Sequence, residues 1–211
     1  MAVPGDRQKG VEVIIEDLGQ KCNEKVDKHR LKHKYWDEKG IEWKRYPLPV
    51  GDYILCTDIV ADVIQRKQKR GIDVKKMDFL GSYKVCVDTK KDMQEIVGNV
   101  CGKQHPRFRD ECILAQNNNI ALYVLIENKD GVKSIDDVFK WQNPRLHDYN
   151  KIKFMHNLGK WQSKKLPKQP PTSGQTLAKA LLTMQLKYGV EFVFCHPEEA
   201  GEKILELLGA S

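Results

Sequence analysis

A nearly uninterrupted apolar run, IALYVLI at residues 120–126, constrains the fold more than any other segment. A strand with one exposed face alternates polar and apolar residues, whereas a run without alternation is typical of a strand covered on both faces. Further strand-like runs lie at residues 11–16, 41–46, 50–56, 83–90 and 190–195. Because segments with helical spacing alternate with these strands, the sequence predicts an α/β fold.

Apolar residues recur with helical spacing at about 22–37, 93–100, 106–117, 176–188 and 197–208. Two polar, basic segments interrupt this pattern. Residues 57–82, with the run RKQKR, are predicted to form an inserted basic loop that has room for a short helix. Residues 141–172, with the run PKQPP, are predicted to form a mobile basic loop. Residues 173–211 then add helix, strand and helix, and the whole chain, 1–211, is predicted to be one domain.

The charge balance points to a polyanionic partner. The chain has 36 Lys and Arg against 29 Asp and Glu, which gives a formal net charge of +7 and a pI near 9.0. No apolar run is long enough to span a bilayer and the N-terminus lacks the apolar segment of a signal peptide, so we expect a cytoplasmic protein without a membrane partner. Six cysteines without a CxxC pair favour reduced cysteines over a structural zinc site.

An acid and a lysine stand two positions apart in the strand-like run VCVDTK, at Asp88 and Lys90. Side chains at this spacing share one face of a strand. A second acid, Asp52, stands upstream in the strand-like run LPVGDYIL. Mg²⁺ prefers such hard oxygen ligands, and a nearby lysine neutralises or orients the attacked phosphate, so the pattern indicates metal-dependent phosphodiester cleavage. Ordinary surface charge at two strand ends is the alternative interpretation.

The order of these motifs resembles the nuclease domain of the XPF family, which has the restriction-endonuclease-like PD-(D/E)XK fold. The run LPVGDYIL matches the family's Gly-Asp-Tyr strand, and VDTK at residues 87–90 stands where Val-Glu-Arg-Lys is expected. Arg107-Phe108 fits the following helix, and LYVLIE at residues 122–127 fits the next strand. The resemblance covers about residues 11–128 and implies a core with a mixed central sheet flanked by helices.

The chain departs from the family pattern at several positions. EDLGQ at residues 16–20 replaces Asp-x-Arg-Glu-Gln, so Glu16 is assigned to the first acid, with Leu18 and Gly19 in place of Arg and Glu. Thr89 replaces the family arginine, and Gln94 stands where the last Asp of the signature belongs, for which Asp92 or Glu95 could compensate.

By this resemblance the chain is a Mg²⁺-dependent DNA endonuclease, with Mn²⁺ as a substitute, that cuts flaps, forks or other branched DNA in repair or recombination. The resemblance implies Asp52, Asp88 and Lys90 as catalytic residues and Glu16, Asp52 and Asp88 as metal ligands. It implies DNA contacts at Lys103, Arg107 and Gln20, although Arg107 could instead pair with Glu111 at i+4. It also allows a homodimer, and the small size fits a phage or prophage gene. A catalytically weak DNA-binding subunit of the same fold is the alternative function.

Three other features have a structural interpretation beside a functional one. His29 and His33 have the i,i+4 spacing of a metal-binding pair but lack the glutamate of HExxH, which favours ordinary surface or core histidines. The basic runs at 66–70 and 164–165 could follow DNA phosphates or simply be solvated. Four tryptophans could stack on bases, although the first two fall in periodic segments and are expected in the core: Trp36, Trp43, Trp141 and Trp161.

Overall fold

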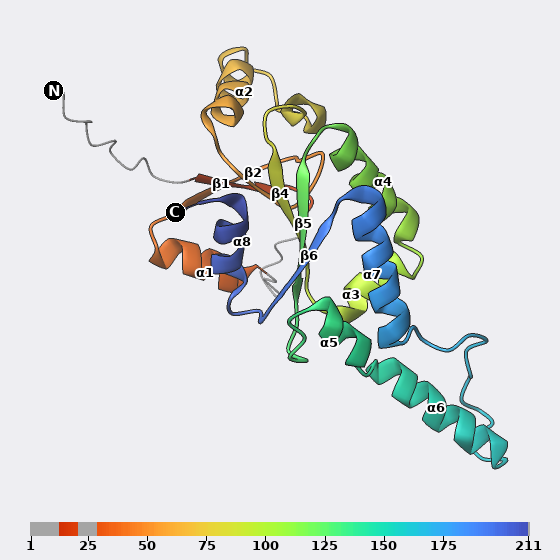
Figure 1. The fold of residues 1–211 in the computed structure, drawn as a ribbon. Coiled ribbons are helices and arrows are strands. Elements are labelled where there is room, and N and C mark those ends of the chain that lie inside the picture. The colour runs from red at the N-terminus through yellow and green to blue at the C-terminus, as the bar shows by residue number, and fades with distance from the viewer. Residues whose placement is uncertain (1–12, 21–28, 211) are drawn as a thin grey trace. The chain divides into compact units, whose positions relative to one another are not determined.

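The structure is a computed structural model that describes residues 13–20 and 29–210. The chain forms two compact units, one of residues 1–88 and 198–211 and one of residues 89–197. In both units helices accompany strands, as the alternation in the sequence predicts (Figure 1). The predicted α/β fold with a mixed sheet and flanking helices is confirmed. None of the described helices is both long and apolar enough to cross a bilayer.

The first unit contains four strands that form a mixed sheet: β1 (Val13–Asp17), β2 (Glu42–Tyr46), β3 (Tyr53–Leu55) and β4 (Val85–Lys90), whose last two residues belong to the second unit. Strand β1 is central, because it pairs in parallel with β2 and antiparallel with β3. Strand β3 in turn pairs antiparallel with β4, with Tyr53 opposite Val87. The start of the predicted first strand, residues 11 and 12, lies outside the described residues.

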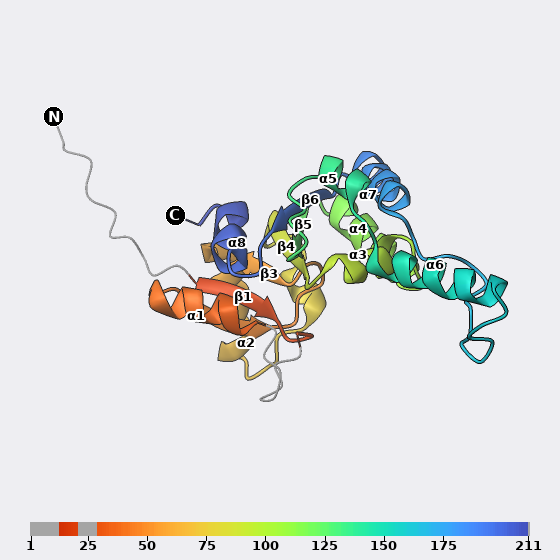
Figure 2. The ribbon, with the colours of Figure 1, turned by 90° about the horizontal axis from the view of Figure 1, so that it is seen from below.

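Two helices that are far apart in the sequence, α1 (Arg30–Glu38) and α8 (Ala200–Leu208), lie side by side in this unit (Figures 1 and 2). The indole of Trp36 on α1 is fully buried, and its Nε1 donates a hydrogen bond of 3.0 Å to the Gly201 carbonyl on α8. The periodicity that predicts a helix at 22–37 is therefore confirmed from residue 30 onward, while residues 22–28 lie outside the described residues.

Residues 57–82, predicted as an inserted basic loop with room for a short helix, contain more helix than expected. Residues Asp58–Lys69 form helix α2, and Lys76–Phe79 form the short 3₁₀ helix η1. The hydroxyl of Thr57 caps α2, and two apolar side chains one turn apart, Val60 and Ile64, are buried. The lysines and arginine of its last turn suit the negative end of the helix dipole, so the basic run belongs to a helix.

The second unit contains two parallel strands, β5 (Ala121–Glu127) and β6 (Glu191–Cys195). Residues Val124 to Glu127 are all buried, which confirms that both faces of this strand are covered. Four of the helices add buried apolar side chains to those of the strands: α3 (Met93–Val100), α4 (His105–Asn117), α5 (Ile135–Lys140) and α7 (Gly174–Tyr188).

The fifth helix of this unit, α6 (Pro144–Asn157), corrects the prediction of a mobile loop at 141–172. Asn143 caps it through a hydrogen bond from the Arg145 amide, and Pro144 occupies its first turn, where the missing N–H costs nothing. No residue of α6 is fully buried, and the apolar residues that recur along it, Leu146, Tyr149, Ile152 and Met155, stand among the basic and proline residues that suggested a loop.

Candidate active site

The Gly-Asp-Tyr segment is fixed from both sides in the first unit. Gly51 has φ of +75°, and a Cβ at this position would meet the Cys86 Cβ at 2.8 Å, so both the turn and the close approach to β4 require glycine. The Tyr83 hydroxyl donates to the Val50 carbonyl at 2.9 Å and holds the chain just before the turn. Asp52 therefore stands on a backbone with little freedom to move.

Three acids become neighbours across the strand ends of the first unit. The Asp17 amide donates to the Asp52 carbonyl at 2.7 Å, and the Asp52 amide donates to the Val87 carbonyl at 2.8 Å, next to Asp88. Asp88 is only 4% exposed, whereas Asp17 and Asp52 are partly exposed. Two of the predicted site residues, Asp52 and Asp88, are thus brought together with an acid that the sequence did not single out, Asp17.

Glu16 has a different environment. Its side chain is fully buried, and its carboxylate lies 3.4 Å from His33 Nε2 and 3.3 Å from Arg45 Nε. The Tyr53 hydroxyl donates to it at 3.3 Å and also bonds to His29 Nδ1 at 2.9 Å. We call these five residues the Glu16 cluster. Because successive side chains of a strand point to opposite faces, Asp17 lies on the other face of β1.

The histidines of this cluster are core residues, as the absence of the HExxH glutamate favours. His29 and His33 are both buried, and the His33 ring stacks on Trp43 with the ring centroids 3.9 Å apart. Burial lowers the pKa of His29, and the nearby Lys32 lowers it further, whereas Glu16 and Asp52 act in the opposite direction. The neutral imidazole is therefore the favoured form of His29.

The Asp17 carboxylate holds the loop that leads to the Gly-Asp-Tyr segment. Its Oδ1 accepts a hydrogen bond of 2.8 Å from the Leu48 amide, and its Oδ2 accepts one of 3.0 Å from the Gly19 amide. A carboxylate has about four lone-pair directions, so these two bonds leave each oxygen able to accept a further ligand. The remaining predicted residue of this segment, Gln20, is partly exposed, and its carbonyl accepts a hydrogen bond from Arg45 Nη2.

The other predicted site residues belong to the second unit. Lys90 follows Asp88 by two residues in β4, is 7% exposed, and has its ammonium 5.4 Å from the centroid of the Phe108 ring. A cation at this distance from an aromatic face is attracted by its electron density. Lys103 and Arg107 are exposed, just before and within the first turn of α4.

Two acids proposed as substitutes for the missing signature aspartate have structural roles. The Asp92 carboxylate caps α3 by accepting from the Glu95 amide at 2.8 Å, and the Glu95 carboxylate accepts from the Lys91 amide at 3.0 Å. Gln94, at the position of the missing acid, donates to the Asn143 side chain at 2.9 Å. The side chains of these three residues therefore have structural contacts at the start of α3, and these contacts account for the residues without a role in the candidate site.

The strand-end acids provide the hard oxygen donors that Mg²⁺ prefers. No group of three or more His, Cys, Asp or Glu side chains is arranged to hold a metal ion, as far as residues 13–20 and 29–210 are concerned. The donor types thus fit the metal, and the carboxylate of the predicted ligand Glu16 is enclosed by the other residues of its cluster.

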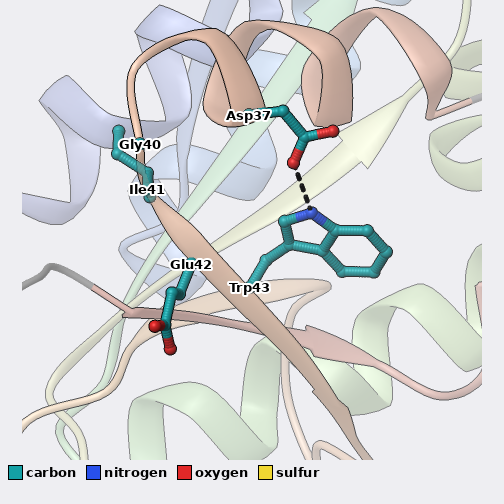
Figure 3. A pocket seen from close by; sticks show the side chains of 5 residues that line it. All are labelled: Asp37, Gly40, Ile41, Glu42 and Trp43. Atoms are coloured by element: carbon teal, nitrogen blue, oxygen red, sulfur yellow. Dashed lines mark hydrogen bonds between the residues drawn. The ribbon is translucent and has the colours of Figure 1, made fainter.

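One pocket of the first unit lies away from these acids. It is lined by Asp37, Gly40, Ile41, Glu42 and Trp43, with the Trp43 indole donating to Asp37 at 3.3 Å (Figure 3). None of the predicted site residues lines it. It is a hollow at the start of β2 rather than part of the candidate site.

Asp17 is an acid of the candidate site that the sequence motifs did not single out. A signal was present in the sequence, because Glu16 and Asp17 are adjacent acids at the end of one strand and only one of them can share a face with a given neighbour. The sequence alone does not show which of these two side chains points toward α1. The contacts of Glu16 with His33 and Tyr53 show that it is Glu16.

Comparison with known proteins agrees with the motifs. The family model described as the ERCC4 domain matches residues 23–208, which is well over half of the chain. Among solved structures, the chain is similar to XPF from Aeropyrum pernix, with 12% sequence identity and a TM-score of 0.49. This match covers 93% of the chain and 60% of that protein's chain. No curated protein matches. The chain belongs to the ERCC4 domain family, the XPF-type nuclease family that its Gly-Asp-Tyr and Asp-Thr-Lys motifs predict.

Proposed function

We propose that the chain is a Mg²⁺-dependent DNA endonuclease that selects flaps, forks or other branched DNA and acts in repair or recombination. The observation that carries this proposal is the backbone pairing by which Asp17 at the end of β1, Asp52 just before β3 and Asp88 in β4 are neighbours. Family membership supports nuclease chemistry, whereas the dependence on Mg²⁺ and the preference for branched DNA are parts of the proposal.

Asp52 and Asp88 would hold the metal in this proposal, and Asp17 would replace Glu16 as the first acid. Bound Mg²⁺ would lower the pKa of a water ligand and stabilise negative charge on the attacked phosphate. Asp88 is only 4% exposed, and a cation beside its carboxylate would stabilise the ionised form there. Lys90, two residues later on the same strand, remains the proposed group that neutralises or orients the phosphate.

The positively charged residues around α4 extend the proposal to DNA binding. Lys103 and Arg107 are exposed near the N-terminal end of this helix, where backbone N–H groups also favour an anion. An arginine binds phosphate through a planar fork of donors. Gln20 is kept as a third proposed contact, because its side chain is partly exposed.

The first experiment compares cleavage of flap, fork, Holliday-junction and plain duplex DNA with Mg²⁺, with Mn²⁺ and with EDTA. We expect cutting of at least one branched substrate with Mg²⁺, less cutting of the duplex, and none with EDTA. Asp88→Asn should reduce the rate by about 100-fold or more, because it removes a charged metal ligand while preserving shape. Asp73→Asn is the matched control, since Asp73 is exposed and lies outside the strands.

The alternative function, a catalytically weak DNA-binding subunit, gives a different result in the same experiment. The departures at Leu18, Gly19 and Thr89 favour this alternative, because the family arginines and glutamate are absent there. DNA binding without cutting on any substrate would support the subunit. Equal cutting by the wild type and by Asp88→Asn would refute the proposed site.

A further inference from the structure

Within the second unit, residues 143–172 form a segment whose two ends meet at Asn143 and Thr172. The Asn143 side chain is buried, donates to the Thr172 carbonyl at 2.6 Å and accepts from the Gln94 side chain at 2.9 Å. This residue therefore joins the two ends of the segment and attaches them to α3. We call residues 144–172 the basic arm. Figures 1 and 2 show its helix, α6, extending away from α5 and α7 in both views.

The basic arm has no core of its own. Helix α6 has no buried residue along its 14 residues, and its apolar Phe154 and Leu158 are 62% and 53% exposed. A helix of this length is marginal in water unless a packed face stabilises it. A helix that has no fully buried residue, yet has a cap at its start, is suited to a partner that covers it.

The charge of the arm identifies the chemistry of that partner. The arm contains one acid, Asp148, and seven basic residues, all exposed: Arg145, Lys151, Lys153, Lys160, Lys164, Lys165 and Lys168. The formal net charge of the whole chain is +7, so this short segment accounts for most of it. Within the described residues none of the seven forms an ion pair, so their charge is available to a polyanion.

Trp161 connects the two halves of the arm. The ammonium of Lys164 lies 4.0 Å and that of Lys151 lies 5.9 Å from the centroid of the Trp161 ring. Lys151 belongs to α6 and Lys164 to the segment that returns from it, so the ring gathers cations from both. Cation–π attraction at such exposed sites is worth about 0.5–1 kcal/mol, enough to bias the lysines toward one region.

We propose that the basic arm is a DNA-binding surface that contacts the phosphates of duplex DNA. Exposed lysines bind the phosphates of DNA through charge, without apolar contacts, whereas a second copy of this arm would be repelled by like charge. A bilayer would require a continuous exposed apolar face, and of the arm's large apolar side chains two, Phe154 and Leu158, are exposed. The proposal rests on the proposed function only for the choice of DNA as the polyanion.

The test is the salt dependence of DNA binding in EDTA, where no cleavage is needed. The variant K160Q/K164Q/K165Q/K168Q removes four charges of the arm. The control K129Q/K133Q/K179Q/K187Q removes four exposed charges from the same unit outside the arm. Each phosphate contact contributes about 0.9 to the slope of log Kd against log salt, so we expect the arm variant to lose roughly 2 to 4 units of slope and the control less than about 1.

Equal slopes for the two variants would overturn the proposal. So would an unchanged slope accompanied by loss of a dimer in sedimentation, since the arm would then bind a second copy. Because the arm has no buried residue in its helix, both variants should keep the melting temperature of the wild type. The nuclease proposal can fail independently, because a chain that binds DNA through the arm but cuts nothing would retain the slope difference.

Limited trypsin digestion of the wild-type chain provides a second measurement. A flap or plain duplex in EDTA should slow cleavage after Lys164 and Lys165 several-fold, whereas cleavage after Lys129 should change little. Cleavage of the arm at the same rate with and without DNA would contradict the proposal.

Discussion

At the scale of single residues, the neighbouring acids Glu16 and Asp17 lie in different environments on opposite faces of β1. Glu16 is enclosed by Arg45, Tyr53 and two histidines, whereas Asp17 is hydrogen-bonded through its backbone to Asp52. The motif comparison identifies the strand end but not the residue, since either acid satisfies a pattern that begins with one carboxylate. The decision depends on which face of β1 packs under α1, and only tertiary contacts determine this.

Exchanging each acid for its amide should separate the two roles. We expect Asp17→Asn to reduce the cleavage rate by about 100-fold or more, because it removes a charged ligand. Glu16→Gln should instead lower the free energy of unfolding by about 1.5–3 kcal/mol, because it removes a buried charged acceptor while leaving Arg45 and the histidines in place. Cleavage rates are measured well below both melting temperatures, and unfolding is followed with urea.

The opposite result of these two substitutions would contradict the assignment of Asp17. If Glu16→Gln abolishes cleavage at full stability and Asp17→Asn cuts as well as the wild type, Glu16 is the first acid, as the family resemblance implies. Asp73→Asn again controls for the loss of one exposed negative charge.

His29 makes a further residue-scale prediction, on the pH dependence of stability. Its pKa in the folded chain lies below the ordinary value of 6.5, chiefly because the imidazole is buried. Between these two pKa values the unfolded chain binds more protons than the folded one, so stability falls as the pH drops below about 6.5. We expect His29→Gln to weaken this fall, measured as the change in melting temperature between pH 7.5 and 5.5. The exposed His147→Gln should leave it unchanged, and an unchanged profile for His29→Gln would contradict the prediction.

At the scale of elements, the sequence predicts those segments whose periodicity is produced by burial. Helices α3, α4 and α7 and strand β5 bury one face or both, and the apolar spacing reports this directly. Helix α2 was not predicted, because it has only two buried apolar residues, Val60 and Ile64, and the charged run RKQKR stands out in its sequence. Helix α6 has no fully buried residue, and its clearest signal was local, Asn143 followed by Pro144.

The Gly-Asp-Tyr segment is predictable for a different reason. Each of its residues has a separate physical requirement: Gly51 for a positive φ against β4, Asp52 for the acid, and Tyr53 for the buried hydrogen bonds to Glu16 and His29. Because three consecutive positions each need a particular residue type, the segment can be recognised in the sequence. The end of the first strand needs only one acid beyond its buried residues, so the sequence did not show whether that acid is Glu16 or Asp17.

At the scale of the whole molecule, the order of the elements other than α2, η1, α5 and α6 follows from the sequence, but the grouping of the elements into units does not. A single domain was predicted and stays a prediction. The described contacts place residues 198–210 with the N-terminal unit, so α8 closes a core whose other members precede residue 89. Local periodicity reveals the face of α8 that is buried but not the partner, which is α1, more than 150 residues away in the sequence (Trp36 to Gly201 spans 165).

This long-range contact predicts that the C-terminal helix stabilises the N-terminal unit. Ending the chain after Pro197 removes Ile204 and Leu208, whose burial is worth roughly 3–6 kcal/mol together, and the hydrogen-bond acceptor of Trp36. Because a typical domain is stable by only about 5–15 kcal/mol, we expect amide exchange in β1 and β3 to lose most of its protection, while β5 and β6 keep theirs. Ending the chain after Leu208 keeps the helix and serves as the control. Equal loss of protection in all four strands would show instead that the chain unfolds as one cooperative unit, because α8 packs on α1 and β3 of the first unit.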